Sequence, residues 1–446
     1  MNISDFRSLW LGQLASTLGT WLLVVGVPLH IFDVTGSTAL TGAAFVAETL
    51  PALVFGPAAG VLVDRLDRRR VMVAADILRA LAILAMLLAR VPDQLWVIYV
   101  AIILENGAAQ LFRPARQALI PALVGDQTRL PAANSTFGMI DGLVRLFGSV
   151  LGGGIYAAFG FSTLVVADSA SYLLSAIGCF MIQHREVRLP SPPVTFTAGI
   201  AELQAGLRHV WGQRLLRGLI VVTALFYLAS GALTALLVPF ARTQLHLDTQ
   251  RYGYLLAALG VGYLFGSPLA RWLIDRWSTR IAVLVSVPWL SVCFGLAFGA
   301  RDYPLAIAAF ALAGAPAVVL IVAVATAYQR CTPGRLLGRV TAAFLTVEMA
   351  VYVAGASAAS SVAEASGVMP VVTVSIVLLG ALVAMLPVLL PRSETPSGPS
   401  SSDVVTLPLT LPLTPPRRPL ADADRPGPHG LARTFSAVAQ PGTHRA

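Results

Sequence analysis

Lysine is absent from the sequence, and all 31 basic residues are arginines. This absence excludes a P-loop nucleotide site, whose lysine contacts the phosphates. It also excludes an enzyme that forms a Schiff base through a lysine amine. We therefore do not expect an ATP-driven pump on this chain.

Charged residues are also scarce. They make up 12% of the 446 residues, against roughly 25% in soluble domains. Hydrophobic residues make up 56%, and the mean hydropathy is +0.76. A water-soluble fold of this size could not cover so much apolar surface, so part of the solvent must be lipid.

Cysteine and metal-binding patterns are rare. Cys179, Cys293 and Cys331 are scattered, without the spacing of metal ligands. The sequence shows no Cys–His pairing and no His–Glu cluster. We therefore expect no metal, no cofactor and no enzyme activity.

The sequence does contain a series of apolar segments, each near the roughly 20 residues that a spanning helix needs. Six precede a polar stretch at 184–215 and six follow it, which gives twelve. The first lacks a basic leader, so we interpret it as a retained span and not a signal peptide. The segments lie near 9–32, 38–63, 71–90, 94–112, 132–158, 161–183, 216–240, 252–274, 281–300, 303–328, 340–363 and 368–391.

Arginine placement predicts the orientation, because cytoplasmic loops carry an excess of Arg. With the N-terminus inside, arginines gather in the inside loops, as at Arg68 to Arg70. The outside loops hold Arg90, Arg242, Arg251 and Arg301. We expect a multi-pass protein of the bacterial inner (cell) membrane with both termini cytoplasmic.

The polar stretches predict four regions. These are an N-terminal six-helix bundle at 1–183, a cytoplasmic linker at 184–215, a C-terminal six-helix bundle at 216–392 and a tail at 393–446. Within the linker, an amphipathic helix could lie on the inner membrane surface or pack on the protein. The tail is rich in Pro, Ser and Thr, and we expect it to be disordered.

The two halves of the chain resemble each other. When the first half is shifted by 211 positions, Asp64 falls on Asp275, Arg65 on Arg276 and Arg69 on Arg280. The order of helices and loops is preserved. A six-plus-six repeat with an inside linker is typical of a two-bundle secondary transporter.

Charge is concentrated in the loop after the second segment, "GVLVDRLDRRR". Gly60, Asp64, Arg65, Arg68 and Arg69 resemble the loop between helices 2 and 3 of the major facilitator superfamily. Three stretches, "DRLDRRRVMVAADILRA", "FRPARQALIPALV" and "ADSASYLLSA", resemble the subgroup that includes bacterial macrolide-efflux and enterobactin-export proteins. Over residues 1 to about 391, the resemblance implies an all-α membrane protein with twelve transmembrane helices in two six-helix bundles.

Charges near the inner end of the helices are candidates for a cytoplasmic gate. Asp76 and Arg79 are three apart and share a helix face. We expect them near the inner surface, where they would join Asp64 and Arg65 in closing the inside. The alternative is a static ion pair that also sets topology. The candidate gate residues are Gly60, Asp64, Arg65, Arg69, Asp76, Arg79, Asp275 and Arg276.

Ionisable residues deep in the spans are candidates for a proton or substrate pathway, because a charge there costs about 2.5–3.5 kcal/mol. Asp141 and Arg145 are four apart and could couple to protons, bind substrate or simply neutralise each other. Glu48, Glu105 and Glu348 have no local partner in the sequence. Burial favours their protonated form, so one of them could carry a proton. Alternatively, each is a neutral acid hydrogen-bonded to the backbone.

Glycines in the fifth segment form the stretch "GSVLGGG". Gly148, Gly152 and Gly153 resemble the Gly-Pro-x-x-Gly-Gly motif of the superfamily's exporters, with Ser149 in place of proline. The resemblance implies antiport, and helix packing is the alternative. Trp21, Phe45, Phe137, Phe226 and Tyr227 could line an apolar cavity, although packing is the commoner role.

Together these features predict a secondary transporter that exports amphipathic small molecules, such as drugs or natural products, against an inward proton gradient. We expect a monomer in the lipid bilayer that binds a small-molecule substrate and no nucleic acid. Alternatives are a solute importer or symporter, a siderophore exporter or a non-transporting membrane partner protein.

Overall fold

The computed structural model describes residues 3–89, 91–124, 130–183 and 196–390, and these ranges form thirteen α-helices. Each apolar segment predicted from the sequence overlaps one helix. The remaining helix, α7, lies in the predicted linker. The bounds are α1 (Ile3–Thr35), α2 (Thr38–Arg65), α3 (Arg68–Ala85), α4 (Trp96–Val124), α5 (Leu130–Phe159), α6 (Phe161–Phe180), α7 (Phe196–Gly212), α8 (Arg214–Thr243), α9 (Thr249–Arg276), α10 (Thr279–Gly299), α11 (Tyr303–Cys331), α12 (Gly334–Ser366) and α13 (Val368–Leu389).

Among the described residues, ten helices are long and apolar enough to cross a membrane. The helix α4 is not one of them, and it carries Glu105, Asn106 and Gln110 in its middle. The described part of α5 contributes a shorter apolar segment, Leu143–Phe159. The chain is therefore a multi-pass membrane protein.

Tight turns separate the helices, and local chemistry explains several of them. Ser37 caps α2 by accepting a hydrogen bond from the Leu40 N–H, and Asp67 caps α3 by accepting one from Arg70. Gly160 and Gly367 adopt φ angles of 80° and 85° between α5 and α6 and between α12 and α13. This left-handed region is open to glycine at no steric cost, so corresponding turns in the two halves use the same residue.

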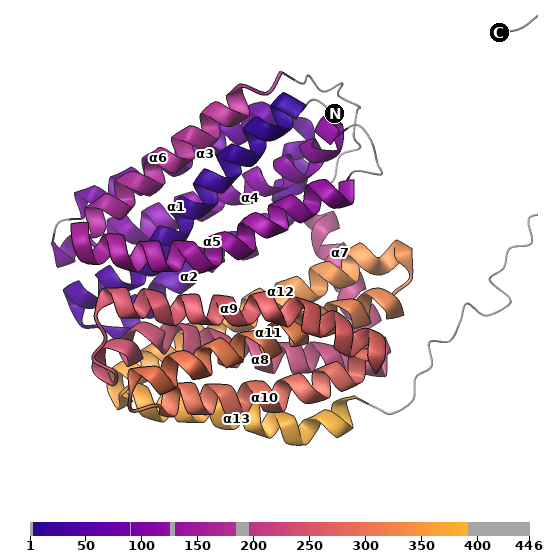
Figure 1. Ribbon diagram of the computed structural model, residues 1–446. Coiled ribbons are helices and arrows are strands. Elements are labelled where there is room, and N and C mark those ends of the chain that lie inside the picture. The colour runs from indigo at the N-terminus through magenta and orange to yellow at the C-terminus, as the bar shows by residue number, and fades with distance from the viewer. Residues whose placement is uncertain (1–2, 90, 125–129, 184–195, 391–446) are drawn as a thin grey trace, which may run out of the picture. The chain divides into compact units, whose positions relative to one another are not determined.

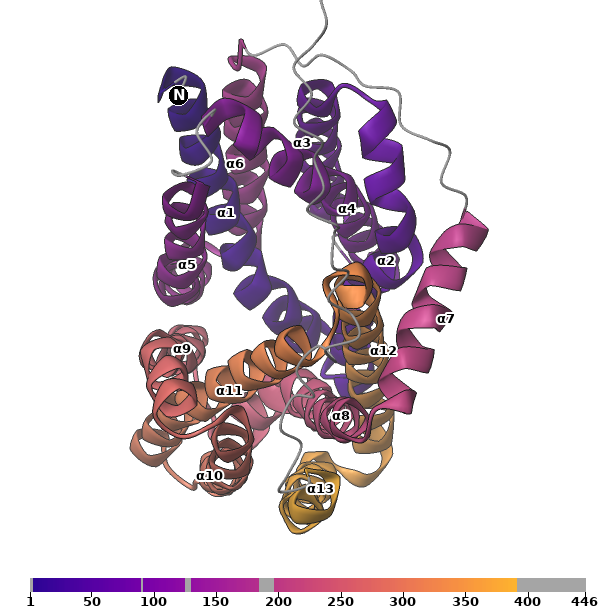
Figure 2. The same ribbon diagram turned by 90° about the vertical axis from the view of Figure 1, so that its right-hand side faces the viewer.

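The helices form two groups, α1–α6 and α8–α13, whose members pack mainly on one another (Figure 1). The groups touch where α5 packs on α9 and α2 packs on α12 (Figure 2). We call these groups the N-half and the C-half.

The linker helix α7 packs on α12, and Figure 2 shows the two side by side. A Cβ at Gly206 would collide with the backbone of Arg339 in α12. Val210 is fully buried, whereas Trp211 is exposed. One face of α7 therefore packs on protein, and a position of its other face at the membrane surface stays a prediction. The rest of the predicted linker before Phe196, and the predicted tail, lie outside the described residues.

The protein has two ends along the direction of its helices, and we name them by the loops that lie there. The Arg-rich end includes the turn between α2 and α3 and the C-terminal end of α9. The distal end includes the turns between α1 and α2, between α8 and α9, and between α12 and α13.

Candidate functional site

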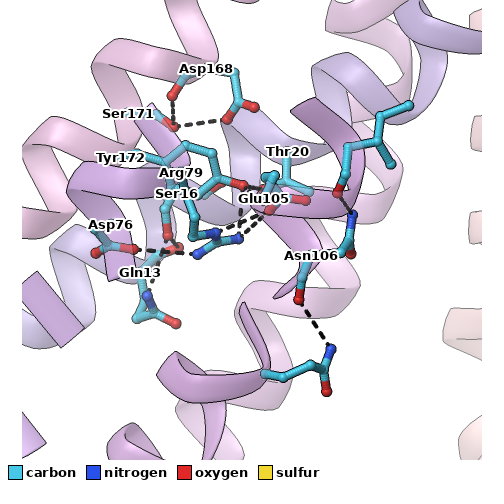
Figure 3. A network of polar contacts seen from close by, with 12 residues as sticks. Gln13, Ser16, Thr20, Asp76, Arg79, Glu105, Asn106, Asp168, Ser171 and Tyr172 are labelled. Atoms are coloured by element: carbon cyan, nitrogen blue, oxygen red, sulfur yellow. Dashed lines mark hydrogen bonds and ion pairs between the residues drawn. The ribbon is translucent and has the colours of Figure 1, made fainter. Parts of the chain in front are cut away.

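A buried arginine organises a polar network inside the N-half (Figure 3). Arg79 of α3 donates to Oε1 of Glu105 in α4 from Nη2 at 2.8 Å and from Nε at 3.0 Å. Its Nη1 contacts Oδ1 of Asp76 at 3.3 Å. The side chains of Arg79 and Glu105 are 11% and 9% exposed. The guanidinium therefore lies between two carboxylates.

Tyr172 of α6 completes the network. Its hydroxyl donates to Oε1 of Glu105 at 2.8 Å and lies 2.7 Å from Nη2 of Arg79. Thr20 of α1 lies 2.8 Å from the same hydroxyl. The Arg79 guanidinium also lies 4.0 Å from the centre of the Tyr172 ring, within the range of a cation–π contact. Four helices of the N-half (α1, α3, α4 and α6) thus contribute side chains to one network.

The network lies at mid-depth, which corrects the sequence interpretation of two residues. At 1.5 Å per residue, Arg79 is roughly 16 Å along α3 from its start at the Arg-rich end. The sequence predicted Asp76 and Arg79 near that end. The structure places them towards the middle of α3 instead. Glu105, which has no local partner in the sequence, is paired with Arg79 of another helix.

Asp168 of α6 also belongs to this region. It is 1% exposed, and Ser171 Oγ lies 3.1 Å from its Oδ1. Asp168 is therefore shielded from solvent inside the N-half. The signal that could have identified it is the spacing of Asp168, Ser171, Tyr172 and Ser175, which repeats at helical period and places four polar groups on one face.

A cavity of about 120 Å³ borders the network. One part of its wall is apolar and includes Leu23, Val27, Phe45, Ile83 and Met86. The polar part of the wall comprises Thr20, Glu48, Arg79, Glu105, Asn106, Arg113, Asp168 and Tyr172.

A second cavity of about 260 Å³ adjoins the first, because both are lined by Thr20, Arg79, Ala109 and Arg113. Its wall also includes Trp21 and Arg116. Of the aromatic candidates, Trp21 and Phe45 therefore line cavities. Phe226 is buried and packs edge-on against Tyr227, and the side chain of Phe137 lies outside the described residues.

Glu48 of α2 faces the first cavity, and no hydrogen bond or ion pair joins its side chain to another described residue. Arg113 lines the same cavity, and its positive charge is close enough to interact with the Glu48 carboxylate through space. Tyr352 of α12, in the C-half, is also close enough to interact electrostatically with Glu48. Glu48 and Glu105 therefore have different environments, since only Glu105 is bound by an arginine.

The two remaining pathway candidates with described side chains lie apart from this network. The Arg145 guanidinium is 5.0 Å from the Trp21 ring of α1 and 4.7 Å from the Tyr263 ring of α9. Arg145 thus contacts both halves, whereas the side chain of its predicted partner Asp141 lies outside the described residues. Glu348 is half-buried in α12, within electrostatic range of Tyr227 and Tyr328.

The predicted gate residues whose side chains are described do not form one cluster. Asp275 pairs with Arg271 of its own helix at 3.5 Å, and both are exposed, as is Arg276. The surroundings of Gly60 and the side chains of Asp64 and Arg65 lie outside the described residues.

Arg69 binds the end of another helix. It donates to the carbonyl oxygen of Phe180, at the C-terminus of α6. Arg280, its counterpart in the sequence repeat, donates to the carbonyl oxygen of Leu390 at the C-terminus of α13, at 2.8 Å. A cation is favoured at a helix C-terminus, and the same contact occurs in both halves.

The α5 glycines allow close helix contacts. A Cβ at Gly148 would lie 2.7 Å from Cβ of Trp21, and one at Gly152 would lie 3.1 Å from the Leu22 carbonyl oxygen. Gly153 faces the C-half, where a Cβ would lie 2.9 Å from the Thr249 carbonyl oxygen. Packing thus accounts for all three glycines, and their link to antiport stays a prediction.

Comparison with known proteins identifies relatives that match more than half of the chain. The model of a family described as transmembrane secretion effector matches residues 1–420. The multidrug efflux pump Tap of Mycolicibacterium fortuitum is 27% identical over 386 residues, which cover 84% of this chain and 93% of Tap. Enterobactin exporter EntS of Shigella boydii is 28% identical, over 75% of this chain and 79% of EntS.

Macrolide efflux protein A of Streptococcus pyogenes is 25% identical over 58% of this chain. That match covers 66% of the relative, just under two thirds of its length. Among solved structures, a bacterial homologue of the iron transporter ferroportin in an inward-facing state matches with a TM-score of 0.73 and 15% identity. The match covers 86% of this chain and 98% of that one. The resemblance to the macrolide-efflux and enterobactin-export subgroup is confirmed.

Proposed function

The chain belongs to the transmembrane secretion effector family of the major facilitator superfamily, and from this we propose that it is a proton-coupled exporter of amphipathic small molecules. Its family and relatives are transporters, which are not enzymes. The relatives include pumps named for drug, macrolide and enterobactin efflux. The driving ion, the direction and the substrate class are our inferences.

The proposed topology has twelve spans in two six-helix bundles. The helices α4 and α5 would complete each set of six, because both are long enough to cross a membrane. Polar residues in α4 are compatible with a span because they face neighbouring helices and a cavity. The Arg-rich end would be cytoplasmic, as the distribution of arginine predicts.

The observation that carries the proposal is the position of Glu48. Its carboxylate lines a cavity of the N-half with an apolar and a polar part, and no described cation forms an ion pair with it. An acid in such a place can gain a proton without first breaking an ion pair. Glu105, in contrast, is held by Arg79 and Tyr172. We infer that Glu48 exchanges the proton, while Glu105 stays paired with Arg79.

The cavity walls also favour an amphipathic substrate. Apolar side chains such as Val27 and Met86 would contact an apolar body, and polar groups such as Asn106 would orient it. The two adjoining cavities lie in the N-half. We infer that substrate enters beside Glu48 and that loading of one ligand disfavours the other, as antiport requires.

The test uses purified protein in proteoliposomes with an imposed pH gradient. Movement of ethidium, a macrolide and a catecholate siderophore is measured, with protein-free liposomes and a protonophore as controls. We expect flux of at least one compound toward the acidic compartment, abolished by the protonophore. Proton-coupled export would be contradicted if the flux were the same with and without the pH gradient. It would also be contradicted if folded protein moved none of the compounds. Flux of the siderophore alone would select the siderophore-exporter alternative.

A further inference from the structure

A carboxylate of the C-half binds the start of a helix in the N-half. Oε2 of Glu364, near the C-terminus of α12, accepts hydrogen bonds from the backbone N–H groups of Thr38 at 2.7 Å and Ala39 at 3.0 Å. Thr38 and Ala39 are the first residues of α2. Such N–H groups have no partner within their own helix, and a negative charge is favoured there. Glu364 therefore caps a helix of the opposite half.

An ion pair joins the halves at the same end. Oδ2 of Asp33, in the last turn of α1, lies 2.7 Å from Nη2 of Arg242 in α8. Arg242 also donates to the carbonyl oxygen of Leu247 at 2.8 Å and to Oγ1 of Thr249 at 3.0 Å. The arginine is thus fixed by its own half, and the carboxylate comes from the other.

Small residues allow the halves to approach closely between these polar contacts. A Cβ at Gly42 of α2 would collide with the side chain of Ser360 in α12, and Ser360 is 2% exposed. Gly153 of α5 and Gly253 of α9 face each other in the same manner. These close contacts exist only while the two halves stay together at this end.

We propose that Glu364 and Arg242 form a distal latch, which holds the two halves together at this end and which must open in each transport cycle. The proposal rests on the proposed transport function, because a transporter has to expose its cavity on both sides of the membrane in turn. Neither residue belongs to the cavity network, and neither was a candidate in the sequence.

The latch can open without leaving α2 uncapped. Ser37, which belongs to the N-half, accepts a hydrogen bond from the Leu40 N–H at 3.1 Å. When the halves separate, this cap remains, and water can replace Glu364 at Thr38 and Ala39. The N–H groups of Thr38 and Ala39 are therefore satisfied by Glu364 when the halves are together and by water when they are apart. A switch between two conformations requires two such satisfied states.

Cysteine labelling tests the latch directly. A reporter, Ser360→Cys, is placed in a background carrying Cys179→Ala, Cys293→Ala and Cys331→Ser, and its reaction with a soluble maleimide is timed on purified protein in detergent. Ser360 is 2% exposed and packs against Gly42 of α2 in the other half, so the rate reports separation of the halves at this end. We expect Glu364→Ala to raise the rate about two- to fivefold, the effect of losing one charge at a helix N-terminus. Glu364→Gln should raise it less, because the amide oxygen still accepts hydrogen bonds.

The matched control is Asp302→Asn. Asp302 is also a distal acid that caps a helix, but it caps α11 within the C-half, by accepting from the Leu305 N–H at 2.9 Å. Its substitution should leave the labelling rate unchanged. Asp33→Asn provides a second test of the latch and should raise the rate, with monodispersity in gel filtration confirming the fold of every variant.

Unchanged labelling in both Glu364→Ala and Asp33→Asn would overturn the latch, as would an equal rise in Asp302→Asn. Because the reaction needs neither substrate nor a proton gradient, this failure is separate from failure of the proposed transport. Absence of flux in proteoliposomes would reject export and leave the labelling result standing.

Discussion

Arg79 and Glu105 are joined by two hydrogen bonds that end on the same carboxylate oxygen, at 2.8 and 3.0 Å. The pair is almost fully buried, and it connects α3 to α4 in the middle of the N-half. Breaking a buried pair by removing one partner costs about 3–5 kcal/mol, because the remaining charge is left uncompensated. The pair is therefore the point at which the N-half should be most sensitive to charge removal.

The first prediction concerns the two sides of this pair. Arg79→Gln should lower the melting temperature of the purified protein more than Glu105→Gln does. Loss of the arginine leaves Asp76 and Glu105 buried together without a cation, whereas loss of Glu105 leaves Asp76 beside Arg79. The measurement is thermal unfolding in detergent.

The control for this comparison is Arg271→Gln. Arg271 and Asp275 also form an ion pair within the protein, but their side chains are 86% and 62% exposed. An exposed pair contributes little, so the melting temperature should barely change. Equal losses in Arg271→Gln and Arg79→Gln would show that burial of the Arg79 pair is unimportant.

The second prediction concerns the repeated contact at the Arg-rich end. Arg69→Ala and Arg280→Ala should each destabilise the protein by about 0.3–1 kcal/mol, the value of a cation at a helix C-terminus. Arg69 also lies 5.0 Å from the Phe180 ring centre, so its loss should cost slightly more. Arg70→Ala, at an exposed neighbour, is the control for thermal unfolding, and a loss as large as that of Arg69→Ala would contradict the capping role.

The third prediction uses two adjacent glycines of α5. Gly153→Ala should weaken the contact between α5 and α9, because its Cβ would lie 2.9 Å from one backbone atom and 3.0 Å from another. In Gly154→Ala the Cβ meets nothing within 4 Å. The expected result is slower transport and faster Ser360→Cys labelling for Gly153→Ala alone. Identical behaviour of both variants would argue against a close approach of the halves at Gly153.

Much of the fold could be predicted from the sequence because spanning helices need long apolar runs. Each predicted segment overlaps a helix, and Gly160 and Gly367 mark corresponding turns. The repeat also predicted the equivalence of Arg69 and Arg280, although the role expected for Arg69 was gating. A charged residue in a loop can bind any nearby carbonyl, and sequence spacing does not reveal which helix end is close.

The site was harder to predict because its partners lie far apart in the chain. Arg79 and Glu105 come from different helices, so local spacing left Glu105 unpaired. In the sequence, Glu364 and Asp33 are ordinary acids near the ends of apolar segments. Only the packing of the halves places Glu364 against Thr38 and Asp33 against Arg242. Pairings within one helix, such as Asp76 with Arg79, could be read directly.

The most direct test of the central claim is gradient-driven transport by Glu48→Gln in proteoliposomes, measured beside substrate exchange without a gradient. The amide cannot release a proton, so the account predicts that accumulation driven by the pH gradient is lost while exchange of substrate continues. Glu48→Gln protein that accumulates substrate at the wild-type rate under the same gradient would contradict the account.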